Sequence, residues 1–230
     1  MTATDFLYPF LSGDSTAVTA GHNDGNGEGI PARRSALLTD LARSAGAKWE
    51  ASMTATADAL DANEGALLAA ANVVRSAGRV LVAGNGGSSC DADRFVRLLA
   101  TSSDHRTLSL TADPAVLTAL ANDIGVERIF ARLVEAYGRP GDALVVFSTS
   151  GQSPNLLAAL EMAHRRGLRT IAFAGYGGGR FTNNDDVDVA IVVDDSSVHR
   201  IQEAQATLVD TLVDALACAI DAPAAAGTVG

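Results

Sequence analysis

Five short apolar runs mark the middle of the chain, and the stretch between each run and the next is long enough for a helix or a long loop. The runs are residues 80–83, 107–110, 143–147, 170–174 and 187–193. Short apolar segments bounded by polar turns are typical of buried strands. Their alternation with longer segments predicts an α/β fold on a mainly parallel sheet. Asp113-Pro114 and Ser153-Pro154 predict two helix starts, and Gly167 predicts a helix end.

The segments on either side of these runs have helical patterns. Residues 33–75 are rich in alanine with leucine at intervals, which predicts two helices separated by a break near Asn63-Glu64-Gly65. Apolar residues that recur at spacings of seven and four predict a last helix over about 196–220.

The polar stretch near the N-terminus suggests how the chain is divided. Residues 12–31 are rich in Gly, Ser, Asp and Asn and contain few apolar side chains to bury. We therefore expect a flexible N-terminal extension over residues 1–31, one domain over 32–222 and a disordered tail over 223–230. A chain of 230 residues with 47% hydrophobic content can bury one sizeable core, which agrees with a single main domain.

Composition narrows the class of protein further. With 17 basic against 27 acidic residues, the net charge of -10 argues against a nucleic-acid or anionic-membrane partner. Two cysteines are too few for a disulfide framework, and no apolar run is long enough to span a bilayer. The N-terminus carries no basic residue of the kind that opens a signal peptide, so we expect a cytoplasmic protein. The four histidines are scattered without metal-ligand spacing.

Two turns rich in glycine and hydroxyl groups, residues 84–89 and 148–153, each lie between an apolar run and a helical stretch. Small residues let backbone N–H groups approach a ligand closely, and a following helix N-terminus adds partial positive charge. Because strand carboxyl ends meet at one edge of a parallel sheet, the pair predicts a site for a small phosphorylated molecule. A plain tight turn without a ligand is the alternative for the first turn taken alone. The dinucleotide fingerprint is not met, since its third glycine would fall at Ser89.

The two turns, together with Asp91-Ala92-Asp93, residues 116–123 and residues 199–203, resemble the sugar isomerase (SIS) domain, specifically its phosphoheptose isomerase branch. The similarity covers roughly residues 33–220. The resemblance implies a three-layer α/β/α sandwich with a five-stranded parallel sheet. It also implies a homodimer or homotetramer that binds sedoheptulose 7-phosphate or a related sugar phosphate at a subunit interface.

The resemblance further implies which residues bind the substrate. Around the phosphate it places Ser148, Thr149, Ser150 and Ser153. Near the sugar it places Asn85, Gly86, Gly87, Asn122, Asp123 and Gln202.

The positions that carry the catalytic base and zinc in the family are altered here. Arg94 stands in place of a histidine, Leu98 in place of the glutamate that acts as base and ligand, and Asp210 in place of a second histidine. We therefore expect no zinc cofactor. Isomerisation still requires a base and a group that stabilises the enediolate, and the candidates are Arg94 for the charge and Glu203 or Asp210 for the carboxylate.

Two functions remain open on the sequence. One is a sugar-phosphate isomerase of the phosphoheptose type with a changed, metal-free acid–base set. The other is a non-catalytic sugar-phosphate sensor or scaffold, as degenerate members of the family look to be. Under the second reading Arg94, Glu203 and Asp210 are surface or salt-bridge residues.

Overall fold

The computed structural model describes residues 29–102 and 104–217, and the chain divides into two compact units, residues 1–46 and 47–230. The predicted tail and the predicted extension up to residue 28 lie outside the described residues. The elements, in chain order, are α2 (Gly29–Ser76), β1 (Val80–Gly84), α3 (Gly87–Ser102), β2 (Thr107–Ser109), α4 (Pro114–Ile124), η2 (Val126–Arg128), α5 (Ile129–Tyr137), β3 (Ala143–Ser148), α6 (Pro154–Arg165), β4 (Arg169–Gly175), η3 (Tyr176–Gly178), β5 (Val189–Val193) and α7 (Val198–Ala217). Among the helices of this described part, none is both long and apolar enough to cross a membrane.

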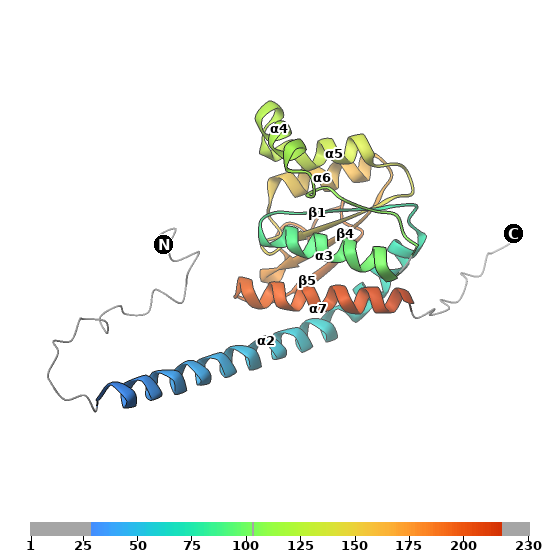
Figure 1. Ribbon diagram of the computed structural model, residues 1–230. Helices are drawn as coiled ribbons and strands as arrows, with labels where there is room; N and C mark the ends of the chain where they lie inside the picture. Colours follow the sequence, from blue (N-terminus) through green and yellow to red (C-terminus); the bar gives the residue numbers. More distant parts are fainter. Residues whose placement is uncertain (1–28, 103, 218–230) are drawn as a thin grey trace, which may run out of the picture. The chain divides into compact units, whose positions relative to one another are not determined.

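The strands form one five-stranded parallel sheet in the order β2-β1-β3-β4-β5, so the predicted α/β sandwich is confirmed (Figure 1). Val80 on β1 is paired with Thr107 on β2 and with Ala143 on β3. The chain passes from β1 to β2 on one side of β1 and then returns to form β3 on the other side of β1. The strand order therefore reverses between β1 and β3, and open α/β sheets bind ligands at such a switch point.

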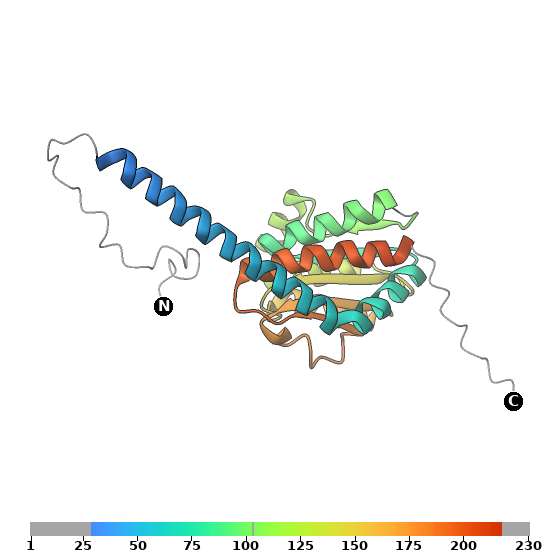
Figure 2. The ribbon, with the colours of Figure 1, turned by 90° about the horizontal axis from the view of Figure 1, so that it is seen from below.

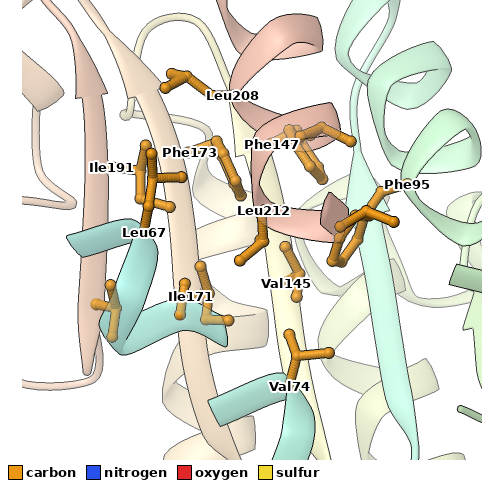
Figure 3. Close-up of a cluster of buried hydrophobic side chains, with 14 of the residues drawn as sticks. Leu67, Val74, Phe95, Val145, Phe147, Ile171, Phe173, Ile191, Leu208 and Leu212 are labelled. Atoms are coloured by element: carbon orange, nitrogen blue, oxygen red, sulfur yellow. The ribbon is translucent and has the colours of Figure 1, made fainter. Parts of the chain in front are cut away.

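Each face of the sheet buries its own apolar cluster. Side chains alternate between the faces, so Val80 and Val82 join one cluster while Leu81 and Ala83 join the other. The first cluster lies beneath α2, α3 and α7, and Figure 3 shows its large members between the sheet and these helices. The second lies mainly beneath α5 and α6. Helices α3 and α7 run side by side on the first face (Figures 1 and 2).

Helix α2 is continuous from Gly29 to Ser76, so the predicted break near residues 63–65 is wrong. The reason is tertiary, because Asn63 lies buried against β5 instead of ending a helix. Its Nδ2 donates to the carbonyl oxygens of Ala59 and Val192, and its Oδ1 accepts the Val192 N–H. The same amide thus serves the helix and the free edge of the outermost strand.

The other predicted helix limits agree closely with the structure. Asp113 accepts from the N–H groups of Ala115 and Val116, and Pro114 occupies the first turn of α4 as predicted. The last helix, α7, begins at Val198, two residues after the predicted start. Its predicted end at residue 220 lies outside the described residues.

Candidate functional site

The two glycine- and hydroxyl-rich turns lie side by side at the carboxyl ends of β1 and β3. A reciprocal amide pair joins them, because Asn85 Nδ2 donates to Asn155 Oδ1 and Asn155 Nδ2 donates to Asn85 Oδ1, each at 2.9 Å. Asn155 is buried at the start of α6. Asn155 carries no functional signal in the sequence, since only the pairing of β1 with β3 brings it to the first turn.

The first turn is compact, and glycine is required at position 84, where a Cβ would collide with the Ser88 carbonyl. A Cβ at Gly87 would meet Nε2 of Gln202 and displace that side chain. Gln202 lies on α7, so the structure brings this predicted sugar-side residue against the glycine turn. Asn85, Gly86 and Gly87 are themselves exposed, which leaves their backbone open to a ligand.

Hydroxyl groups converge in the second turn. The Oγ atom of Ser148 lies 3.5 Å from Ser150 Oγ and 3.4 Å from Ser153 Oγ, and it accepts the Gly151 N–H. Ser153 is the N-cap of α6, but its hydroxyl makes no capping bond to that helix. The hydroxyls therefore gather in front of a helix N-terminus, where an anion is favoured.

Backbone hydrogen bonds from the end of β4 and from the loop after it hold the second turn. Arg180 N–H donates to the Gly151 carbonyl at 2.9 Å, and Gly175 N–H donates to the Thr149 carbonyl at 2.9 Å. Gly151 has φ of 60°, and a Cβ there would collide with the Gly178 carbonyl. These contacts fix the backbone of Thr149 and Gly151 within the turn.

The structure does not bring Asn122 and Asp123 to the turns of the same chain. Both are exposed on α4, and Asn122 Nδ2 donates to Asp123 Oδ1 at 2.9 Å. Within residues 29–102 and 104–217, no hydrogen bond joins either residue to residues 84–89 or 148–153.

Arg94 and Asp210 form an ion pair between α3 and α7. Nη2 of Arg94 lies 2.7 Å from Oδ1 and 2.6 Å from Oδ2 of Asp210, and the two side chains are 42% and 43% exposed. Leu98, one turn further along α3, packs partly buried against the apolar core. This donor set does not fit zinc, since a guanidinium binds no metal and a leucine offers no ligand atom. No group of three metal-ligating side chains occurs among the described residues.

Glu203, the other proposed carboxylate, makes a contact that the sequence did not predict. Its Oε2 accepts a hydrogen bond from the Ser52 hydroxyl on α2. Glu203 is exposed on α7, the residue next to Gln202. It therefore stands beside the sugar-side residue, with the Ser52 hydroxyl as its hydrogen-bond donor and the charge of Arg200 within electrostatic reach.

Asp91 is a further buried group close to the first turn that the sequence analysis did not single out as functional. It lies on α3 and is 8% exposed, and its Oδ2 has no hydrogen-bond partner. Burial raises the pKa of the Asp91 carboxyl to about 6, while the charge of Arg94 acts in the lowering direction. No spacing signal in the sequence reveals this burial.

This chain is similar to known proteins of the SIS domain family. The family model described as SIS domain matches residues 43–175. A phosphoheptose isomerase from Thiobacillus denitrificans is 38% identical over 179 residues, which cover 73% of this chain and 90% of that protein. One from Chlorobium phaeobacteroides is 42% identical over 151 residues, covering 63% of this chain and 66% of that protein.

A solved structure has the same arrangement. The structure of a phosphoheptose isomerase from Francisella tularensis superimposes with a TM-score of 0.71 at 34% sequence identity, covering 76% of this chain and 96% of that chain.

Proposed function

Because this chain belongs to the SIS domain family, we propose that it binds a sugar phosphate of the sedoheptulose 7-phosphate class at its two turns and interconverts the aldose and ketose forms without zinc. The observation that carries this proposal is the reciprocal Asn85–Asn155 pair, which holds both turns at the switch point between β1 and β3. The phosphoheptose isomerases at 38% and 42% identity support the same class of substrate and reaction.

The phosphate is assigned to the second turn. Ser148, Ser150 and Ser153 supply converging hydroxyls, and Thr149 supplies a fourth from a backbone fixed by Gly175. Hydrogen bonds to a charged acceptor are stronger than those between neutral groups, and the N-terminus of α6 adds a favourable dipole. An anion can therefore be held here although the chain is acidic overall.

The sugar is assigned to the first turn. Asn85, Gly86 and Gly87 present exposed backbone, and the Gln202 amide lies directly against Gly87. An amide can donate and accept at once, which suits a row of sugar hydroxyls. The reacting carbons would then lie next to the start of α3.

The chemistry needs one proton moved between two carbons. A base takes the proton from the carbon beside the carbonyl, the enediolate forms, and the proton returns to the former carbonyl carbon while the hydroxyl proton passes between the two oxygens. Arg94 keeps donors beyond the Nη2 that binds Asp210, and these would hold the enediolate oxygens. Asp210 or Glu203 would act as the base.

The ion pair also favours a second function. Arg94 and Asp210 satisfy each other's charge, and Leu98 cannot move a proton. Under this second function the pair serves solely as a clamp between α3 and α7. In that case the protein is a non-catalytic sugar-phosphate sensor or scaffold that keeps the binding turns and lacks the reaction.

We further propose a homodimer or homotetramer with the site at a subunit interface. Helix α4 is apolar yet buries none of its residues, and it carries Asn122 and Asp123 away from the turns of its own chain. A second copy that covers α4 would receive this pair in its own site. Large apolar side chains are also exposed along α2: Leu37, Leu38, Leu41, Trp49 and Met53. A cytoplasmic location is proposed from the cysteine count alone.

One experiment separates these functions. The purified protein is incubated with sedoheptulose 7-phosphate in D₂O, with zinc or with a chelator, while calorimetry measures binding and NMR measures deuterium entry at the first two carbons. We expect binding in every condition, and carbon-bound deuterium that the chelator does not abolish. Binding without deuterium entry identifies the sensor. Efficient zinc-dependent exchange contradicts the metal-free assignment, and absent binding rejects the sugar-phosphate site.

A further inference from the structure

Two buried polar atoms on α3 have no hydrogen-bond partner, and both belong to charged side chains. They are Oδ2 of Asp91 and Nε of Arg94. The Nη2 end of Arg94 reaches Asp210 and partly faces solvent, but its Nε is enclosed. Buried polar atoms are nearly always paired in proteins, so two orphans of opposite charge on one helix require an explanation.

Helix geometry brings these two side chains together. Residues three apart on a helix are surface neighbours, and a long side chain leans toward the helix N-terminus, over the residue three or four positions before it. Arg94 therefore leans toward Asp91. The charge of Arg94 also acts to lower the pKa of Asp91, against the larger raising effect of burial, which places the two groups within electrostatic reach.

The facing helix offers no competing cation at this level. Gln202 contacts Gly87 near the start of α3, and Asp210 contacts Arg94 further along it. Between these two contacts α7 carries the fully buried Gln205, whose amide atoms are also without partners. The titratable groups described at this junction are Asp91, Arg94, Arg200, Glu203 and Asp210. Arg200 forms an ion pair with Asp195, and the charge that acts on Asp91 is that of Arg94.

We propose that Asp91 is a positioning residue for Arg94: a small rotation of the two side chains lets the Asp91 carboxylate receive the Nε–H, which has no partner in the structure, while Asp210 receives the Nη2–H. Two carboxylates then fix one guanidinium beside the glycine turn. The remaining Nη1 donors are then aimed in one direction. This assignment rests on the proposed function, in which Arg94 holds the enediolate oxygens. A fixed cation does this without reorganising during the reaction. This preorganisation is the main source of electrostatic stabilisation in catalysis.

The contact itself is tested without any sugar. The Nε proton of Arg94 is assigned by NMR in the full chain and in D91A, which has no acceptor at this position, with D93A as the matched control. Asp93 is two residues away, but its carboxylate accepts from Ser109 and Thr111 instead. We expect a slowly exchanging Arg94 Nε–H in the wild type and in D93A, and loss of its protection in D91A. Equal exchange rates in wild type and D91A overturn the proposal.

The functional role is tested by non-additivity. If Asp91 acts through Arg94, D91N lowers the rate of deuterium entry into sedoheptulose 7-phosphate about tenfold with little change in KM. The double variant D91N/R94Q is then no slower than R94Q, and D91E restores part of the rate. Additive losses, or a change confined to KM, overturn the positioning role. A wild type that binds the sugar without exchange rejects the proposed isomerisation and with it this role, while the NMR result still decides the contact.

Discussion

Arg94 on α3 and Asp210 on α7 bind each other at 2.6–2.7 Å, although they are 116 positions apart in the chain. They stand at the two positions where the family resemblance implies metal-binding histidines. On that resemblance a cation and an anion stand where two neutral ligands are implied, and the two charges satisfy each other. With both side chains more than two-fifths exposed, the pair contributes at most about 1 kcal/mol to stability. Its importance lies in the two positions it occupies, where the resemblance implies metal ligands.

Restoring the replaced ligands tests this interpretation. The triple variant R94H/L98E/D210H presents two imidazoles and a carboxylate around Gln202, a donor set that suits zinc. We expect the variant to retain about one zinc per chain after dialysis, measured by elemental analysis, whereas the wild type retains none. The double variant R94H/D210H, which lacks the carboxylate, serves as the control and should bind zinc more weakly. A triple variant that is folded but binds no zinc would show that positions 94, 98 and 210 do not converge.

The second turn is tested by removing hydroxyls. S150A/S153A deletes two of the converging groups, and each charge-assisted hydrogen bond is worth about 1.5–3 kcal/mol. We expect affinity for sedoheptulose 7-phosphate, measured by calorimetry, to fall about tenfold or more for each hydroxyl. The control is T101A, since the Thr101 hydroxyl bonds only to carbonyls of its own helix. If S150A/S153A binds as tightly as T101A, these hydroxyls do not contact the phosphate.

The strands and helix starts could be predicted because their signals are local. The apolar runs of β1 and β3 are strands buried along their whole length, and Asp113 caps α4 through bonds within its own turn. The two turns of the proposed site were likewise visible from their glycine and hydroxyl content. Side-chain relationships across the fold could not be predicted in this way. Asn155 reaches Asn85 only because β3 pairs with β1, and a sequence does not reveal strand order.

The break predicted in α2 shows how tertiary contacts override local preference. Asn63 and Gly65 both weaken a helix in isolation. In the fold, Leu67, Ala70 and Val74 bury an apolar face on the sheet, and Asn63 gains three hydrogen bonds. Most helical stability in proteins comes from such packing, so the helix continues through the weak stretch.

Asn63 is therefore predicted to stabilise the fold through its hydrogen bonds to edge strand β5. N63A removes the only side-chain amide that satisfies both backbone groups of Val192 on edge strand β5 within the described residues. Buried donors and acceptors left unpaired cost about 1–3 kcal/mol each, partly recovered by water at an edge. We expect N63A to lower the unfolding free energy by about 2–3 kcal/mol in urea denaturation. The control is N72A on the exposed side of the same helix. A loss no larger than that of N72A would mean that the edge is satisfied without Asn63.

Asp91 predicts a pH dependence of stability whose sign can be worked out. Its folded pKa of about 6 lies above the ordinary value of 3.8, because burial disfavours the ionised carboxylate more than Arg94 favours it. Between these two values the folded chain holds a proton that the unfolded chain has lost. The contribution of Asp91 to the unfolding free energy is therefore fully present below pH 3.8 and is lost as the pH rises through 6.

The variant D91N isolates this effect, because it cannot ionise. We expect the unfolding free energy of the wild type to decline relative to that of D91N as the pH rises from 4 to 7, by at most about 3 kcal/mol for a shift of roughly two units. Urea denaturation at intervals across this range measures the difference, with D93N as the control for removal of a charge from the same helix. A difference between wild type and D91N that stays constant with pH would mean that Asp91 titrates at its ordinary value, and a difference of the opposite sign would mean that Arg94 outweighs burial.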